Sequence, residues 1–188
     1  MNKVLDFWFG RSHSPELGKV QKKWFEKNAD FDAEILTNFL PQYELAASDQ
    51  LDNWQESAES CLALILLLDQ FPRNMFRGTT QAFATDSKAL ATAEYAVNNN
   101  FDRELLTVQK WFMYLPFEHS ENLEHQQKSL ELFSNLQGEP DSQSVIDFAI
   151  RHLKIIERFG RFPHRNQILG RETTPEEAEF LKQPGSGF

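Results

Sequence analysis

Apolar residues recur at helical spacing along almost the whole chain, and this pattern limits the possible folds more than any other feature. From Val145 to Phe159 they follow the i, i+3, i+4, i+7 order of one helix face. Residues 56–71 are apolar on almost every side, which predicts a central, covered helix. No alternating apolar and polar run is flanked by Asn-Gly or Asp-Gly, as in a β-hairpin. The pattern predicts an all-α fold with these two helices at its centre.

Start and stop signals divide the rest of the chain into further helices. We expect these at residues 17–27, 31–48, 87–98, 103–115 and 121–136. Residues typical of helix N-caps stand at Asp86, Asp102, Ser120 and Thr174, the last followed by Pro175-Glu176-Glu177 as in a capping box. Breaks are expected at Gly10, Pro116, Gly138-Glu139-Pro140 and Gly160. Helices of this length joined by short turns favour antiparallel neighbours, as in helix-pair arrays and irregular bundles.

Length and composition predict one folded domain over residues 1–188. Seventeen Phe and four Trp against eight Gly indicate a dense aromatic interior. The net charge of −9 argues against nucleic acid as the main partner, because phosphate binding needs a basic face. Cys61 is the single cysteine, so an internal disulfide is excluded.

The longest apolar run is too short for a membrane span. It covers Leu62 to Leu68, where a spanning helix needs ~20 residues. The first residues lack the apolar core of a signal peptide. We therefore expect a soluble, cytoplasmic protein with no membrane partner; the sequence does not indicate its oligomeric state.

Two segments far apart in the chain carry nearly the same unusual sequence motif. The first arginine motif covers residues 70–78 (QFPRNMFRG) and the second covers residues 161–171 (RFPHRNQILGR). Each places Phe-Pro, Arg-Asn and Gly directly after a long apolar helix. Seven of the nine arginines lie in these motifs or in the helix that enters the second. Because the guanidinium fork matches planar anions pairwise, the motifs predict an anion site.

Asp69 stands on the apolar stripe of its helix, one turn before Arg73. A buried carboxylate needs a charged or donor partner, and an arginine of the second motif is the natural candidate. One interpretation is a structural ion-pair network of Asp69, Arg73, Arg161 and Arg165. The other is an anion site with arginines left partly unpaired. Pro72 should end its helix, so that each Arg-Asn pair lies on a turn.

The histidines offer acid–base chemistry. His119 is expected at the start of the helix that runs to Leu136, where backbone N–H groups favour anions, and it is the candidate general base. His152 lies on an apolar stripe and should be buried and neutral. A metal site of His119, His152 and His164 with Glu118 or Glu121 is a weaker alternative, because no ligand spacing occurs on one helix. We expect no metal and no cofactor.

We predict that the polar residues of both motifs and the histidine segment converge on one cavity. The ligand-binding candidates are Asp69, Arg73, Asn74, Arg161, His164, Arg165 and Asn166, and the candidate catalytic pair is His119 and Glu121.

Two functions are compatible with such a cavity. The favoured one is a binding module for a small anionic ligand or an acidic peptide. The alternative is a hydrolase or transferase acting on an anionic small molecule, with His119 moving a proton and Glu121 or Asp69 orienting it. The lack of any Gly-x-Ser-x-Gly or Walker-type motif favours binding over catalysis.

Four segments together resemble one known family. They are residues 4–10 (VLDFWFG), 67–74 (LLDQFPRN), 116–121 (PFEHSE) and 158–166 (RFGRFPHRN). In this order they are similar to the mainly bacterial family numbered 924 among the domains of unknown function, over essentially the whole chain. The resemblance implies an all-helical, tetratricopeptide-like fold. It implies no reaction or ligand.

Overall fold

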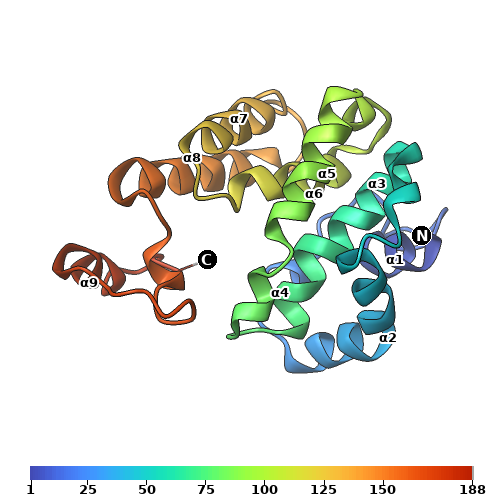
Figure 1. The fold of residues 1–188 in the computed structure, drawn as a ribbon. Helices are drawn as coiled ribbons and strands as arrows, with labels where there is room; N and C mark the ends of the chain where they lie inside the picture. The colour runs from blue at the N-terminus through green and yellow to red at the C-terminus, as the bar shows by residue number, and fades with distance from the viewer. Residues whose placement is uncertain (188) are drawn as a thin grey trace.

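The computed structural model describes residues 1–187, and all regular structure in that range is helical (Figure 1). The α-helices are α1 (Asn2–Phe9), α2 (Ala29–Ala47), α3 (Ala58–Ile65), α4 (Phe71–Met75), α5 (Asp86–Asn98), α6 (Thr107–Glu118), α7 (Leu123–Ser134), α8 (Ser142–Phe159) and α9 (Pro175–Leu181). Short 3-10 turns cover Lys22–Trp24, Asp52–Glu56, Thr80–Phe83, Phe101–Glu104 and Pro163–Arg165. A π-helical segment, η3 (Leu66–Gln70), joins α3 to α4. The predicted all-α class is confirmed.

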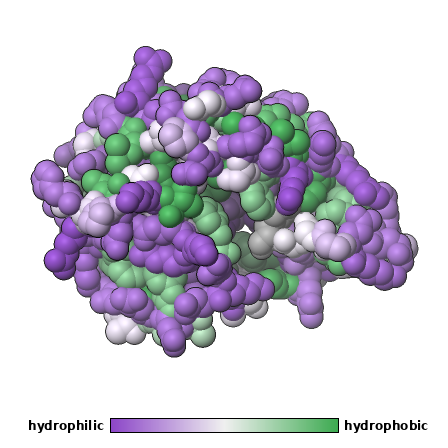
Figure 2. Space-filling view, turned by 180° about the vertical axis from the view of Figure 1, so that it is seen from behind, coloured by the Kyte–Doolittle hydropathy of each residue, from purple (hydrophilic) through white to green (hydrophobic). Residues whose placement is uncertain are grey.

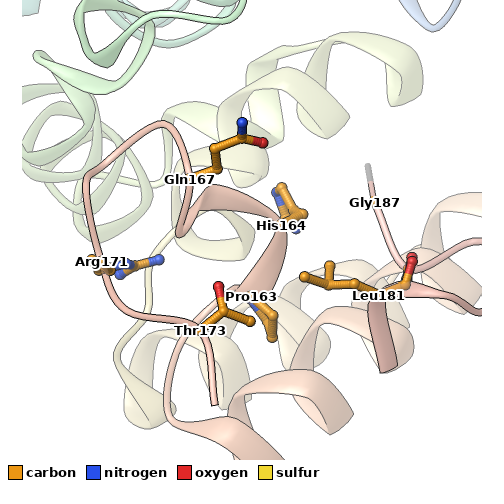
Figure 3. A pocket seen from close by; sticks show the side chains of 8 residues that line it. Pro163, His164, Gln167, Arg171, Thr173, Leu181 and Gly187 are labelled. Carbon is orange, nitrogen blue, oxygen red and sulfur yellow. The ribbon is translucent and has the colours of Figure 1, made fainter. Parts of the chain in front are cut away.

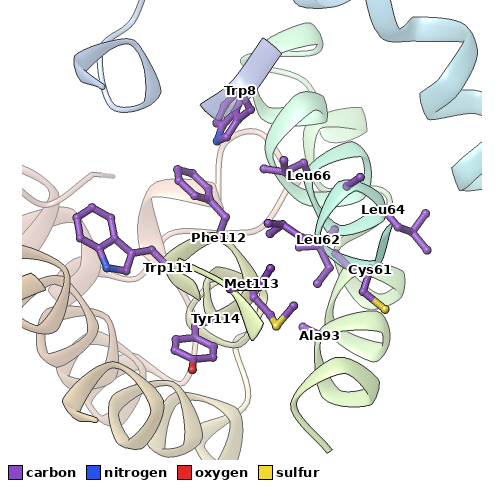
Figure 4. Packing of buried hydrophobic residues seen from close by; sticks show 14 of the residues in the cluster. Trp8, Cys61, Leu62, Leu64, Leu66, Ala93, Trp111, Phe112, Met113 and Tyr114 are labelled. Atoms are coloured by element: carbon purple, nitrogen blue, oxygen red, sulfur yellow. The ribbon is translucent and has the colours of Figure 1, made fainter. Parts of the chain in front are cut away.

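The α3–η3 segment is the centre of the core, as its sequence predicts. Every residue from Cys61 to Gln70 is buried, and most are fully covered. Figure 4 shows Leu62 of α3 and Leu66 of η3 on the side of Phe112 of α6 and Trp8 of α1, whereas Leu64 points away from them. The Trp8 ring lies 5.5 Å from the rings of both Phe71 and Phe112. Dense aromatic packing of this kind adds to the stability that apolar burial provides.

Helix α8 is less central than expected. Its first half, with Val145, Ile146 and Ala149, belongs to the main core. Its second half packs Ile155 and Ile156 against Phe162 in a separate small cluster. In Figure 1 the chain after α8 forms a part of its own beside the helical body, and it carries α9. The second arginine motif therefore begins where the main core ends.

Three boundary predictions are wrong for local reasons. Residues 17–27 do not form an α-helix, because Gly18 has a φ of 80° and only a short 3-10 turn follows. Residues 101–104 are 3-10, and α6 begins at Thr107. The N-cap of α7 is Asn122 rather than Ser120, and its Oδ1 accepts the Glu124 N–H at 2.7 Å. The Thr174 capping box forms as predicted.

Pro72 does not end its helix, and the backbone shows why. A proline in a helix leaves the carbonyl four residues earlier without its usual donor. That carbonyl belongs to Leu68, and the Thr85 hydroxyl donates to it at 2.6 Å. The π-helical turn of η3 widens the chain just before Pro72, which falls at the start of α4. Arg73 and Asn74 therefore lie on a helix and not on a turn.

Pro116 is likewise tolerated inside α6, which continues to Glu118. The side-chain amide of Gln126 closes that helix end by donating to the carbonyls of Glu118 at 2.6 Å and Ser120 at 2.7 Å. Within residues 1–187, no helix combines the length and the apolar character that crossing a bilayer requires.

We predict that Phe71→Ala lowers the free energy of unfolding by ~3–5 kcal/mol, because it empties a site in the aromatic core. Phe71 is fully buried and packs 4.8 Å from the Phe39 ring. Urea titration followed by tryptophan fluorescence measures the change. Phe25→Ala is the matched control: this ring is 60% exposed, and its loss should cost at most ~0.5 kcal/mol. Equal losses in both variants would contradict this description of the core.

Candidate functional site

The two arginine motifs meet at one carboxylate, that of Asp86. Arg73 donates to it twice, from Nη1 to Oδ1 at 2.8 Å and from Nη2 to Oδ2 at 3.0 Å. Arg165 Nη1 lies 3.7 Å from Asp86 Oδ2. Both guanidinium groups also lie over the Phe83 ring. The sequence does not reveal this role, because Asp86 is expected there as an N-cap. In the structure the N-cap is Thr85, and Asp86 is the first residue of α5.

Asp69 is fully buried beside Arg73 and pairs with His119. Its Oδ1 lies 2.7 Å from His119 Nδ1 and 3.4 Å from Arg73 Nη1, and its Oδ2 accepts the Gln70 amide at 2.6 Å. Burial alone would raise the pKa of Asp69, but Arg73 and His119 outweigh it and hold the pKa below the ordinary value. The carboxylate is therefore ionised and accepts the Nδ1–H of His119.

His119 lies at the end of α6 and not at the start of a helix, because α6 continues through Pro116. Burial, and next the charge of Arg73, lower its pKa, although Asp69 offsets part of this. The ring is therefore neutral near pH 7 and carries its proton on Nδ1. Within residues 1–187, its Nε2 makes no hydrogen bond to the protein. This nitrogen can accept a proton or a donor from outside.

A second carboxyl–imidazole pair lies next to the first. Glu118 is 3% exposed, and its Oε1 is 3.2 Å from His152 Nδ1. Burial, and next the charge of Asp69, raise the pKa of Glu118 to about 8, while burial lowers that of His152 to about 3. The pair is uncharged at pH 7. Among the described residues, Glu118 Oε2 is buried without a hydrogen-bond partner.

Other candidates anchor the second motif and do not meet Asp69. Glu121 accepts the Phe162 N–H at 2.7 Å and both Nη atoms of Arg171 at 2.7 and 3.0 Å. Arg161 donates to both carboxylate oxygens of Glu177, at 2.6 and 2.8 Å. These contacts hold the pKa of Glu177 at about 2. Of the two carboxylates considered as partners of the His119 ring, the structure places Asp69 beside it and not Glu121.

The side-chain amides of Asn74 and Asn166 bind carboxylates outside the cluster around Asp69. Asn74 donates to Asp32 of α2 at 2.8 Å, beside Arg77, which binds the same carboxylate at 2.7 and 2.8 Å. Asn166 donates to Glu177 at 3.2 Å. Only part of the expected set therefore lies in one cluster around Asp69 and Asp86: Asp69, Arg73, Arg165 and His119.

His164 borders a separate open pocket of about 600 Å³, shown in Figure 3 with Gln167 and Arg171 on its wall. Burial, and next the charge of Arg165, lower the pKa of His164 to about 4. Seen from behind, the surface is hollowed between the helical body and the part that carries α9 (Figure 2). In the described chain, no three His, Cys, Asp or Glu side chains are grouped so that they could hold a metal ion.

Arg165 differs from the other arginines of the motifs. It is 7% exposed, and its guanidinium carbon lies 4.9 Å from the centre of the Phe83 ring and 4.6 Å from that of the Phe162 ring. Its side chain makes no hydrogen bond to any of residues 1–187, and its Nε is fully buried. Burial, and next the charge of Arg73, lower its pKa to about 10, so it stays cationic. Arg73, Arg77, Arg161 and Arg171 each bind a carboxylate with two donors.

The comparisons with known proteins agree with this fold. The model of the family of bacterial proteins of unknown function DUF924 matches residues 4–185. The chain belongs to the DUF924 family. This DUF924 chain is also similar to a solved structure, that of a protein of unknown function from Agrobacterium tumefaciens. The two are 44% identical over 96% of this chain and 95% of that one, with a TM-score of 0.85. No curated protein matches the chain.

We predict that Glu118→Gln makes the DUF924 chain more stable at pH 7.5, by about 2 kcal/mol. The carboxyl has a pKa of about 8 in the folded chain and an ordinary value of ~4.3 when unfolded. Unfolding therefore releases a proton, and the stability of the wild type falls as pH rises between these two values. Urea titrations at pH 4.5 and 7.5 measure this loss, which should be smaller in Glu118→Gln. Glu176→Gln, at an exposed ion pair, is the control; equal pH dependence in both variants would contradict the assignment.

Proposed function

We propose that this protein binds a small anionic ligand at Arg165. The observation that carries the proposal is the buried Arg165 side chain, which makes no hydrogen bond to any residue from 1 to 187. Buried charges in proteins are paired and hydrogen-bonded, since an unsatisfied buried polar group costs ~1–3 kcal/mol. A bound carboxylate or phosphate oxygen would supply the missing acceptor.

The surroundings of Arg165 restrict how an anion can approach. The guanidinium group lies over the rings of both Phe83 and Phe162, and Asp86 lies 3.7 Å from Nη1. The edge formed by Nε and Nη2 is the part that is left for a ligand. Two parallel N–H donors on one edge match the two oxygens of a carboxylate or phosphate. A small ligand is favoured over an acidic peptide, because a buried edge accepts a single anionic group more easily than a chain.

The other ion pairs support a positioning role for the rest of the network. Arg73 holds Asp86, and Glu121 and Glu177 hold Arg171 and Arg161. The Glu121–Arg171 pair joins the second motif to the helical body, and the Arg161–Glu177 pair joins it to α9. Both interpretations of the sequence therefore apply, to different residues. Most arginines of the motifs form structural ion pairs, and Arg165 is the residue that would bind the ligand.

The alternative function is a hydrolase or transferase acting on the same anion. Asp69 fixes the Nδ1–H tautomer of His119 at 2.7 Å, so that Nε2 has the geometry of a general base. Asp69 takes the orienting role in this alternative, and Glu121 does not. A cytoplasmic location remains a prediction from the sequence.

We predict that acetate, malonate or phosphate raises the melting temperature of the wild type. A hundredfold excess over Kd should add ~2.7 kcal/mol to the free energy of unfolding. Arg165→Ala should lose the ligand-induced shift, whatever its own melting temperature. Arg158→Ala is the matched control, because Arg158 pairs with Glu176 at the surface.

The absence of any anion-dependent shift in the wild type, or equal shifts in wild type and Arg165→Ala, would reject the site. An anion that is bound and also consumed, with a rate lost in His119→Ala, would favour the alternative enzyme. A shift produced by acidic peptides but not by small anions would indicate a peptide partner instead.

A further inference from the structure

We infer that the anion at Arg165 binds together with one proton, which His119 takes up. This inference rests on the proposed function and adds the chemical class of the ligand: the monoanion of a weak acid, such as a monocarboxylate. It also gives the Asp69–His119 pair a function in binding that does not require catalysis.

The first step is the charge balance of the buried cluster. Two cations, Arg73 and Arg165, face two carboxylates, Asp69 and Asp86, at distances of 2.8 to 3.7 Å. An added anion would leave one negative charge without a matching cation. This charge would lie inside the protein, because Asp69 is fully buried and Arg165 is nearly so. A lone buried charge is costly, and such a site commonly changes its protonation instead. One proton per bound monoanion restores the balance.

The second step is to find the group that receives the proton. The titratable and charged groups around His119 and Arg165, from every element that packs on this cluster, are Asp69, Arg73, Asp86, Glu118, Glu121, His152, His164, Arg165 and Arg171. Glu121 and Arg171 bind each other. Glu118, with a pKa of about 8, is already protonated at pH 6.5. Burial lowers the pKa of His152 to about 3 and that of His164 to about 4, and the carboxyl beside His152 is the uncharged Glu118, whereas His119 faces the ionised Asp69.

His119 is built to hold this proton. Its Nδ1–H already points at the ionised Asp69, and a second proton on Nε2 would create an imidazolium–carboxylate ion pair at 2.7 Å. The side chain is 14% exposed, which gives the proton a path from solvent. Arg73 and burial keep the ring neutral in the empty site. A bound anion would offset that arginine charge and make protonation favourable.

Two consequences follow for the ligand. Affinity rises as pH falls, by at most tenfold per pH unit when one proton is taken up. A dianion would need two protons, so monoanions are preferred over dianions of the same size. Acetate is a suitable probe because it stays a monoanion between pH 6 and 8, whereas phosphate titrates in that range.

The test is calorimetric titration of the whole chain with acetate at pH 6.5, in two buffers of different ionisation enthalpy. The inference predicts uptake of between about half and one proton per acetate, and a Kd that increases from pH 6 to pH 8. His119→Gln should bind acetate without proton uptake and with a Kd that does not depend on pH. His125→Gln, at a histidine that contacts Ser120 and Glu94 near the surface, should behave as the wild type.

Each other outcome is decisive. If the wild type does not bind acetate, phosphate or malonate, the proposed function itself fails. If it binds acetate without proton uptake, this inference fails and the proposed function stands. Uptake that persists in His119→Gln would place the proton elsewhere and overturn the assignment. Should that variant not fold, the ring nitrogen signals of His119 in the wild type decide: Nε2 must become protonated on addition of acetate.

Discussion

The arrangement of the polar cluster depends on the fully buried carboxylate of Asp69. It lies on the π-helical turn of η3, at the centre of the apolar core, where an isolated charge would be costly. Arg73, one turn later, and His119, at the end of α6, satisfy it. Arg73 in turn binds Asp86, which lies near Arg165. One buried charge thus links η3, α4, α5, α6 and the second arginine motif.

Every arginine of the motifs except Arg165 binds a carboxylate with two donors. Arg73, Arg77, Arg161 and Arg171 each donate two hydrogen bonds in this way, although Nε of Arg171 is buried without a partner among the described residues. Arg165 lies over two aromatic rings and its side chain makes no hydrogen bond within residues 1–187. Structural ion pairs are expected to be complete, because an incomplete buried pair destabilises the fold. The exception is therefore more informative about function than the pairs. Together with the Asp69–His119 pair, it favours a site that takes up an anion and can move a proton.

Much of the fold and part of the candidate site could be predicted from the sequence. Helical spacing predicted the α3–η3 core, and the repeated Phe-Pro-Arg-Asn words predicted that Arg73 and Arg165 lie close together. The missed features depend on contacts between distant residues. The Thr85 hydroxyl compensates for Pro72, so a helix continues where local rules predict a turn. Asp86 resembles an N-cap, and nothing local shows that it binds two arginines. Glu177 belongs to a recognisable capping box, yet the same carboxylate also binds Arg161, which therefore does not join the cluster around Asp69.

The most direct test of the central claim is the Nε–H signal of Arg165 in a ¹⁵N-labelled sample, assigned by its loss in Arg165→Lys. A site that binds anions through the free edge of Arg165 predicts a saturable shift of this signal on addition of acetate. The Nε–H signal of Arg77, which Asp32 already accepts at 2.7 Å, should stay in place. An Arg165 signal that does not move, or moves only as much as that of Arg77, would contradict the account.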